Sequence, residues 1–452
     1  MVFHYHPLCK PLRLTHLMFA DDLLLFCKGD VQSIMVILRT YSTFSIASGL
    51  KMSKGKSNVY FNEVKEEVKH DILQVSRCVE GKLPFRYLGV PIKTSRLTAH
   101  DCAPIIEKLM NKIRGLGTRK LSYAGRLVLI KSVLKTYHNY WAQMFILPSG
   151  VIARIEAICR NFLWDGSTDY IRTPLVGWSK IYKLKSEGGL GLKDDLVWNK
   201  VALGKLLWWL YAKADHLWVK WVSHTYLKSQ DWKSYVPTQD TSWYWRKVCK
   251  VRDLLIVPYL QKQWDNIPGK TYTIAKGYEY LRYKNDQVPW SSLVWNQMTI
   301  PKHSLLAWIY FHKGLNTHEK LKSFGLDIDT TCLICGDGDD SLDNIFFSCE
   351  YSQRIISRIE QWMGFSLPRD DVTDWWINIS GSRDKTDTIN GIINAMMYSI
   401  WHQRNRSKHE ATVVRPETVA TGIIKDMKIW LAKVVTRRKN LQDQWIYGLC
   451  GA

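Results

Sequence analysis

The sequence has no long apolar run, few cysteines and a shortage of acidic residues. No stretch approaches the ~18–20 apolar residues that a membrane span needs. The first residues show no basic cap followed by an apolar core, so we expect no secretory signal. Ten cysteines in 452 residues are too few for a disulfide framework. These shortages exclude membrane and secreted disulfide-rich proteins. The scattered cysteines indicate a reducing intracellular compartment, of which the nucleus is one, and the localisation stays open.

The shortage of acidic residues leaves the chain strongly basic. Against 41 Asp and Glu stand 63 Lys and Arg, which gives a net charge of +22. Such an excess attracts polyanions and supports salt-dependent, sequence-independent binding of RNA or DNA. A basic protein without a polyanionic partner is the alternative, and charge alone does not separate the two.

The order of predicted elements indicates an α+β fold that becomes mostly helical after about residue 95. Apolar runs flank Ala20-Asp21-Asp22, which predicts a β-hairpin, and a helix is expected over 31–47. Strands are expected at 59–61 and 85–90, with Pro91 closing the second. Further helices are predicted over the ranges 124–137, 304–313, 389–409 and 423–435.

Tryptophan is unusually frequent, with 21 residues concentrated in part between 195 and 300. Clusters of tryptophan at helical spacing favour packing in a core. Stacking on nucleic-acid bases is the alternative, and it requires exposed rings.

Two further patterns carry chemistry. Asp21 and Asp22 at a hairpin tip are the type of carboxylate pair that holds Mg²⁺ in two-metal phosphoryl transfer, although acidic pairs are also ordinary turn residues. Cys332, Cys335 and Cys349 cluster near the other end of the chain, with two thiols on a tight turn as in tetrahedral zinc sites.

Motifs in consecutive order along most of the chain resemble one family. The Phe19-Ala20-Asp21-Asp22 turn resembles the palm motif of reverse transcriptases from plant LINE-type (non-LTR) retrotransposons. The tail pattern Trp401-x2-Arg404-Asn405-x3-His409 resembles the segment that often follows the zinc-binding domain of that family. Other matching motifs lie at 48–51 with 56–57, 85–91, 123–134, 162–166, 187–191 and 301–349.

The resemblance implies a polymerase palm hairpin followed by helical thumb, zinc-binding and tail regions. The implied domains are a partial palm (1–95), a thumb-like region (96–165), a tryptophan-rich connector (166–290), the zinc-binding domain (291–375) and a basic helical tail (376–452). Asp21 and Asp22 are implied as Mg²⁺ ligands, and Lys56 as a residue near the nucleotide phosphates. A solvated surface lysine is the other interpretation of Lys56, and Ser53 replaces the asparagine usual in the family.

Two departures from the family pattern shape the functional prediction. The third carboxylate and the fingers of family polymerases lie before the palm turn, where this sequence has eighteen residues, so we expect Asp21 and Asp22 to lack their partner. Asn344 stands where the family has histidine, in the order C-x2-C-x8-N-x4-C. An amide oxygen is a poor zinc ligand beside sulfur, so we expect zinc to be bound weakly or lost. The alternative is a surface loop whose thiols never meet.

Together these observations predict a truncated, catalytically dead reverse-transcriptase-like protein that binds nucleic acid without sequence preference. Mg²⁺ is expected only if catalysis remains. An active RNA-directed DNA polymerase component and a decayed reading frame without function are the alternatives. The expected nucleic-acid contacts are the thumb cations Arg119, Lys120, Arg126, Lys131 and Lys135.

Overall fold

The computed structural model describes residues 2–53, 55–116, 121–168, 173–228, 230–256, 272–367, 382–437 and 443–451. Helices make up 58% of the structure and the strands are few and short, which confirms the α+β class with mostly helical content. None of the helices in these ranges is both long and apolar enough to cross a membrane.

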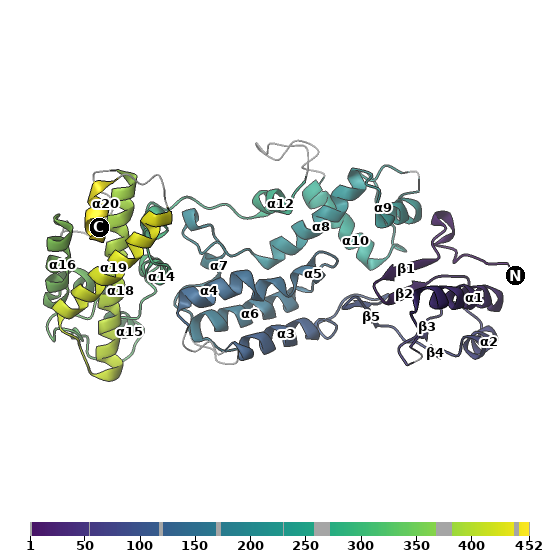
Figure 1. Ribbon diagram of the computed structural model, residues 1–452, viewed down its shortest axis with the longest axis horizontal. Helices are drawn as coiled ribbons and strands as arrows, with labels where there is room; N and C mark the ends of the chain where they lie inside the picture. The colour runs from purple at the N-terminus through teal and green to yellow at the C-terminus, as the bar shows by residue number, and fades with distance from the viewer. Residues whose placement is uncertain are drawn as a thin grey trace. The chain divides into compact units, whose positions relative to one another are not determined.

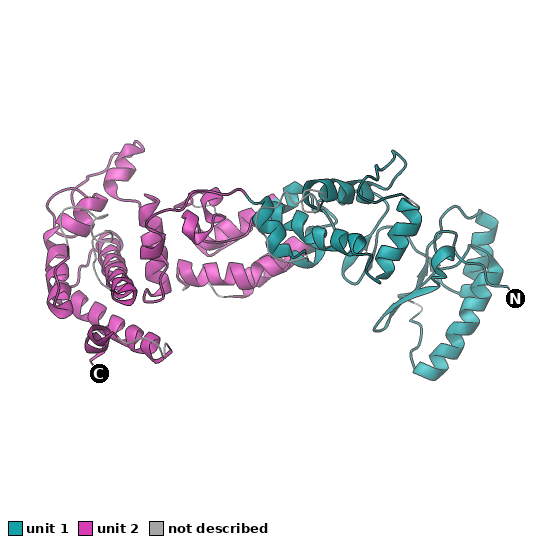
Figure 2. Ribbon diagram, turned by 90° about the horizontal axis from the view of Figure 1, so that it is seen from above, with its two compact units in different colours: residues 1–104, 138–152, 195–282 teal, residues 105–137, 153–194, 283–452 magenta. Residues whose placement is uncertain are grey.

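The chain forms two compact units, and each unit is assembled from three separate segments (Figure 2). Unit 1 comprises residues 1–104, 138–152 and 195–282, and unit 2 comprises 105–137, 153–194 and 283–452. The chain therefore passes back and forth between the units. The five serial domain ranges expected from the sequence stay a prediction.

Unit 1 begins with a small α+β part. Its elements are the 3₁₀ helix η1 (Lys10–Leu12), β1 (His16–Phe19), β2 (Asp22–Leu25), α1 (Val31–Ser48), β3 (Asn58–Val59), α2 (Glu66–Ser76), β4 (Val79–Glu80), β5 (Phe85–Tyr87) and β6 (Val90–Ile92) (Figure 1). The strands form three two-stranded sheets, β1-β2 and β5-β6 antiparallel and β3-β4 parallel.

The predicted hairpin and the helix after it are confirmed. Strands β1 and β2 pair from His16 opposite Leu25 to Phe19 opposite Asp22. Helix α1 is capped by the Asp30 side chain, which accepts from the Ser33 amide, and it ends at Gly49 with a φ of 75°. Glycine adopts this left-handed conformation without a Cβ penalty.

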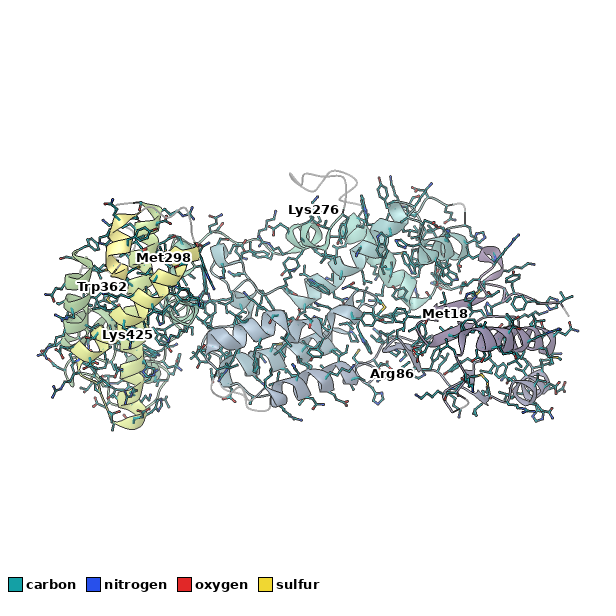
Figure 3. The ribbon with its side chains drawn as sticks, in the orientation of Figure 1. Met18, Arg86, Lys276, Met298, Trp362 and Lys425 are labelled. Carbon is teal, nitrogen blue, oxygen red and sulfur yellow. The ribbon has the colours of Figure 1, made fainter. Side chains whose placement is uncertain are left out.

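The prediction of one strand over 85–90 is wrong. Leu88 and Gly89 have φ of 50° and 81°, which folds the chain back and makes two strands, β5 and β6. Pro91 lies within β6 opposite Arg86 and closes nothing. Arg86 is labelled in Figure 3, as is Met18 on β1.

The rest of unit 1 is helical and rich in tryptophan. Its elements are α5 (Asn139–Ala142), α8 (Asp195–Tyr211), α9 (Leu217–Val222), η5 (Ser223–Leu227), α10 (Trp243–Val251), η6 (Arg252–Ile256) and α12 (Ile274–Leu281). Helix α8 packs against α5, α10 and α12. Trp198, Trp232 and Trp245 are buried, which supports core packing for these rings.

Unit 2 consists of helices, and its elements follow in chain order. They are α3 (Ala103–Gly115), which starts in unit 1, α4 (Tyr123–Ser132), η3 (Leu134–Thr136), α6 (Ser149–Asp165), which also starts in unit 1, α7 (Trp178–Ile181), η4 (Lys185–Glu187), α13 (Ser291–Val294), α14 (Pro301–Phe311), α15 (His318–Ser323), η7 (Asn344–Ser348), α16 (Glu350–Met363), α18 (Arg383–Glu410), α19 (Pro416–Arg437) and α20 (Gln444–Cys450).

Helix α18 is central to the C-terminal part of unit 2. It packs against α13, α14, α16, α19, α20 and η7, and its apolar residues Ile389, Ile392, Ile393, Met396, Met397 and Ile400 are buried. The predicted helix over 389–409 is thus confirmed and is longer at its start. The helix predicted over 124–137 is shorter, because α4 ends at Ser132 and a 3₁₀ turn follows.

Candidate metal centre

The cysteine turn is built by backbone hydrogen bonds. The Gly336 amide donates to the Cys332 carbonyl oxygen at 2.9 Å, and the Cys332 amide donates to the Gly338 carbonyl oxygen at 2.9 Å. Gly336 and Gly338 have φ of 75° and 69°, which favours glycine at both positions. These contacts hold Cys332 and Cys335 on one tight loop, as their C-x2-C spacing predicts.

The third cysteine lies in a different part of the structure. Cys349 lies directly before α16, and its amide donates to the Asn344 carbonyl oxygen at 2.8 Å, across the π-helical turn η7. Phe346 and Ile345 in this turn are buried. Because the turn is anchored in the core, it fixes the place where Cys349 meets the loop.

The three sulfurs converge. The Sγ atoms of Cys332, Cys335 and Cys349 all lie within 4.8 Å of one another, and those of Cys332 and Cys349 are 4.0 Å apart. In a tetrahedral zinc site with Zn–S bonds of about 2.3 Å, two sulfurs lie about 3.8 Å apart. The thiols therefore fit a zinc ion, and the alternative of thiols that never meet is wrong.

The surroundings favour a thiolate at one of these positions. The Cys349 thiol, with the backbone N–H groups of Cys335 and Ile334, lowers the pKa of Cys332 to about 5 against the opposing effect of burial. Donation to Cys332 and burial raise the pKa of Cys349. Zinc is bound by the thiolate form, so the loop already stabilises the ligand state at Cys332.

The fourth ligand position is the weak part of the site. Asn344 opens η7, and its Nδ2 atom donates to the Asp339 carbonyl oxygen at 2.7 Å. Within the described ranges, no fourth His, Cys, Asp or Glu joins the three cysteines. The donor set thus consists of three thiols, completed at best by an amide oxygen or water, which suits zinc less well than four sulfur and nitrogen ligands.

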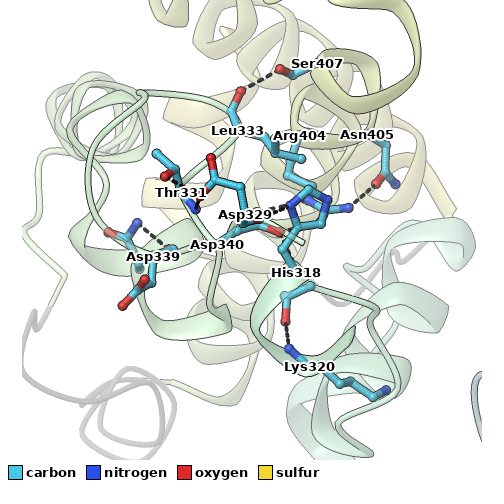
Figure 4. A network of polar contacts seen from close by, with 12 residues as sticks. His318, Lys320, Asp329, Thr331, Leu333, Asp339, Asp340, Arg404, Asn405 and Ser407 are labelled. Atoms are coloured by element: carbon cyan, nitrogen blue, oxygen red, sulfur yellow. Dashed lines mark hydrogen bonds and ion pairs between the residues drawn. The ribbon is translucent and has the colours of Figure 1, made fainter. Parts of the chain in front are cut away.

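Helix α18 anchors the cysteine loop from outside, in the network that Figure 4 shows. The Arg404 Nε atom donates to Asp340 Oδ1 at 3.1 Å, and Nη2 donates to Asp340 Oδ2. The Asp340 carboxylate also accepts from the His318 amide at 2.7 Å, and the Ser407 hydroxyl donates to the Leu333 carbonyl oxygen at 2.5 Å. The tail motif therefore holds the segment that carries Cys332 and Cys335.

Asp340 is not among the site residues predicted from the sequence. It is completely buried, and a buried carboxylate requires a cationic partner. The sequence does contain both partners of this pair, because an acidic residue lies inside the cysteine loop and an arginine lies in the tail motif. Nothing in the sequence alone shows that these two residues meet.

The palm-like aspartates belong to unit 1, whereas the cysteine cluster belongs to unit 2. Asp21 and Asp22 are exposed at the β1-β2 turn, where Ala20 has a φ of 51°. No third His, Cys, Asp or Glu of the described residues gathers with them into a cluster of three. Lys56 is exposed in a turn, where its amide donates to the Ser53 carbonyl oxygen at 3.0 Å. The roles inferred for all three residues stay predictions.

Of the predicted thumb cations in the described ranges, Arg126 and Lys135 are buried and Lys131 is exposed. Lys135 is buried and donates to the Lys193 carbonyl oxygen at 2.5 Å, and Lys131 donates to the Leu190 carbonyl oxygen at 2.6 Å. Partial desolvation of the Lys131 ammonium and the nearby Lys185 ammonium lower the pKa of Lys131 to about 8.

Of the three remaining thumb cations, the structure describes one. Arg126 is buried and donates to the Leu163 carbonyl oxygen at 3.3 Å. Arg119 and Lys120 lie outside the described residues. The binding role of all five thumb cations stays a prediction, although Arg126, Lys131 and Lys135 already serve the packing of unit 2.

Comparison with known proteins shows what the region around this centre resembles. Residues 272–355 match the family of zinc-binding domains in reverse transcriptases, and this range contains the whole cysteine cluster. The chain is also similar to an Arabidopsis thaliana protein that carries the provisional name ribonuclease H protein, with 28% identity over 161 residues. The similarity covers 35% of this chain and 26% of that relative, so the chain spans about a quarter of the relative's length.

Proposed function

We propose that this chain is a reverse-transcriptase-related polypeptide of a plant LINE-type retrotransposon that binds RNA or DNA without sequence preference. The observation that carries the proposal is the convergence of Cys332, Cys335 and Cys349 inside the range that matches the reverse-transcriptase zinc-binding family. When bound, zinc would cross-link the cysteine loop to the start of α16. The similarity to a ribonuclease H protein of a plant supports the same origin.

The charge of the chain supports the choice of partner. A net charge of +22 makes a polyanion the favoured ligand, and release of condensed counterions drives such binding. Binding of this type depends on phosphates and not on base sequence. We therefore propose that the chain binds RNA and DNA in the same way, through their phosphates.

We propose further that the 452-residue polypeptide does not polymerise DNA by itself. Two-metal phosphoryl transfer needs ligands that hold two Mg²⁺ ions about 4 Å apart. Asp21 and Asp22 supply two carboxylates, and no third acidic group of the described residues lies with them. A role as a component of an active polymerase is the second candidate, and the correctly paired β1-β2 hairpin favours it.

Salt titration tests the binding proposal. Purified chain is titrated against labelled single-stranded and duplex oligonucleotides of mixed sequence between about 50 and about 200 mM salt, where counterion release predicts a steep loss of affinity. We expect binding at low salt that weakens linearly on a double-logarithmic plot and varies little with sequence. Affinity that stays flat with salt, or the absence of binding at low salt, would overturn the proposal.

A further inference from the structure

Three motifs from distant parts of the sequence meet around one cavity of unit 2. The cavity has a volume of about 580 Å³, which lies in the range of ~300–1,000 Å³ typical of ligand sites. Helix α4 lines it with the start of the thumb motif, α6 with its C-terminal end, and α14 and α18 with the zinc-binding and tail motifs. All the lining residues belong to unit 2.

The tail motif supplies several of the side chains that line this cavity. Trp401, Arg404, Asn405 and His409 all line it, which accounts for their spacing along one side of α18. Arg404 is also the residue that binds Asp340 in the cysteine loop. Residues on one face of α18 therefore both hold the cysteine loop in place and line the cavity.

Two cations of the wall lie against aromatic rings of the wall. The Lys302 ammonium lies 5.0 Å from the centre of the Tyr398 ring, and the Arg404 guanidinium lies 5.0 Å from the centre of the Trp401 ring. Lys408 is exposed at the rim. Among the described residues that line the cavity, Asp165 is the one acidic side chain. The cavity thus combines an excess of positive charge with flat apolar faces.

Two of these cations have no acidic partner. Among the described residues, no carboxylate pairs with Lys302 or Lys408 within 4.0 Å. Burial and the nearby Arg404 guanidinium lower the pKa of Lys408, whereas Asp340 opposes this effect. An anion placed in the cavity would relieve the repulsion between the neighbouring cations, because it would lie near several positive charges at once.

A polar group of the wall is also left without a partner. Trp164 at the end of α6 is 4% exposed, and its indole Nε1 has no hydrogen-bond partner in the described structure. A buried N–H group without an acceptor costs roughly 1–3 kcal/mol. The Trp164 side chain also lines the cavity, so it adds an aromatic ring to the wall.

We propose that this cavity binds a single-stranded segment of nucleic acid, with phosphates at Lys302 and Lys408 and a base against the Tyr398 or Trp401 ring. Sites for single strands combine a positive groove with aromatic rings on which bases stack. A duplex keeps its base faces stacked inside, so it offers the cavity only its phosphates. The inference rests on the proposed function and specifies where and in which form the nucleic acid binds.

A pair of charge-reversal variants tests the site. Lys302→Glu with Lys408→Glu alters the cavity, whereas Lys425→Glu with Lys433→Glu makes the same change in charge at exposed positions of α19 that do not line it. Binding of a labelled single strand of about 12 nucleotides, a length within the known site sizes, is measured against salt. We expect the cavity variant to lose at least about tenfold in affinity and about one to two units of salt slope. We expect the α19 variant to lose less than about threefold.

A second readout reports the place of contact. Single strands that carry a photoreactive base are cross-linked to wild-type chain, and the adducts are mapped by mass spectrometry. We expect adducts in the part of α18 that contains Tyr398 and Trp401 and in α14. We also expect a duplex competitor to suppress them less well than a single strand does. Circular dichroism and thermal unfolding of both variants show whether they fold, and Lys302→Gln with Lys408→Gln replaces the cavity variant if it does not.

The outcomes separate this inference from the proposed function. If wild-type chain binds no nucleic acid at low salt, both fail. If wild type binds and the two charge-reversal variants weaken binding equally, or the adducts lie elsewhere, the cavity is not the site and the proposed function stands. Equal binding of single strands and duplex by wild type would overturn the preference for single strands.

Discussion

The guanidinium of Arg404 on α18 and the carboxylate of Asp340 in the cysteine loop form a buried ion pair through two hydrogen bonds. Their side chains are 2% and 0% exposed. The pair joins the tail helix to the segment between Cys335 and Cys349. The tail motif therefore takes part in building the metal centre, although it lies more than fifty residues further along the chain.

Replacement of Arg404 by Met should destabilise the chain strongly. The variant leaves the Asp340 carboxylate buried without its cation, and loss of one partner of a buried pair costs about 3–5 kcal/mol. Denaturant unfolding measures the change in the free energy of unfolding. The matched control is Arg406→Met, which removes a more exposed pair with Glu410, and it should cost less than about 1 kcal/mol.

A double-mutant cycle shows whether the two groups act together. We expect Asp340→Asn combined with Arg404→Met to be less destabilising than the sum of the two single changes, because the double variant buries no uncompensated charge. Additive effects would contradict the coupling of the tail helix to the cysteine loop.

Stability should fall in mild acid because of His303 on α14. Burial and the neighbouring Lys302 lower the pKa of this imidazole to about 3. The unfolded state takes up a proton near pH 6.5, whereas the folded state stays neutral, so stability is present above pH 6.5 and is lost as the pH falls below it. Between pH 7 and pH 5 the loss from this residue is about 2 kcal/mol.

Comparison with His303→Phe isolates that contribution. Phenylalanine keeps a ring against Tyr398, whose ring centre lies 4.6 Å from that of His303. We expect the free energy of unfolding of the variant to depend less steeply on pH between 7 and 5 than that of wild type. The same slope in both proteins would show that the imidazole does not resist protonation.

The purified 452-residue chain should extend no primer on an RNA template with Mg²⁺ or Mn²⁺. Asp21 and Asp22 supply too few ligands for two metal ions. Primer extension with labelled nucleotides measures the activity, and Asp21→Ala with Asp22→Ala is the control. Extension by wild type that disappears in this double variant would show that the two aspartates are catalytic in this chain.

Local and periodic features could be predicted from the sequence, and contacts between distant segments could not. The apolar period of α18 and the cap residues of α1 are local signals, and both elements are present. The turn at Leu88 was missed because a leucine with positive φ has no sequence signature. The burial of Lys135 depends on the Lys193 carbonyl group, 58 residues away, which no helical pattern reveals.

The same contrast between local features and distant contacts applies to the candidate metal centre. The C-x2-C spacing and Cys349 correctly predicted which sulfurs meet. The anchor at Asp340 and the cavity lined by Tyr398 and Trp401 depend on how α18 packs against α14 and η7. Such packing is decided by the tertiary structure, and the sequence specifies it only through the whole fold.

Zinc titration of wild-type chain and Asn344→His tests the central claim most directly. Zinc affinity is measured by competition with a chromophoric chelator, with Cys332→Ser as the variant that removes a ligand. We expect wild type to bind about one zinc ion weakly, Cys332→Ser to bind none, and Asn344→His to bind substantially more tightly, because histidine completes four ligands. The melting temperature of Asn344→His should also rise when zinc is added. Equal affinities of wild type and Asn344→His, or no binding by either, would contradict a metal centre formed by these three cysteines.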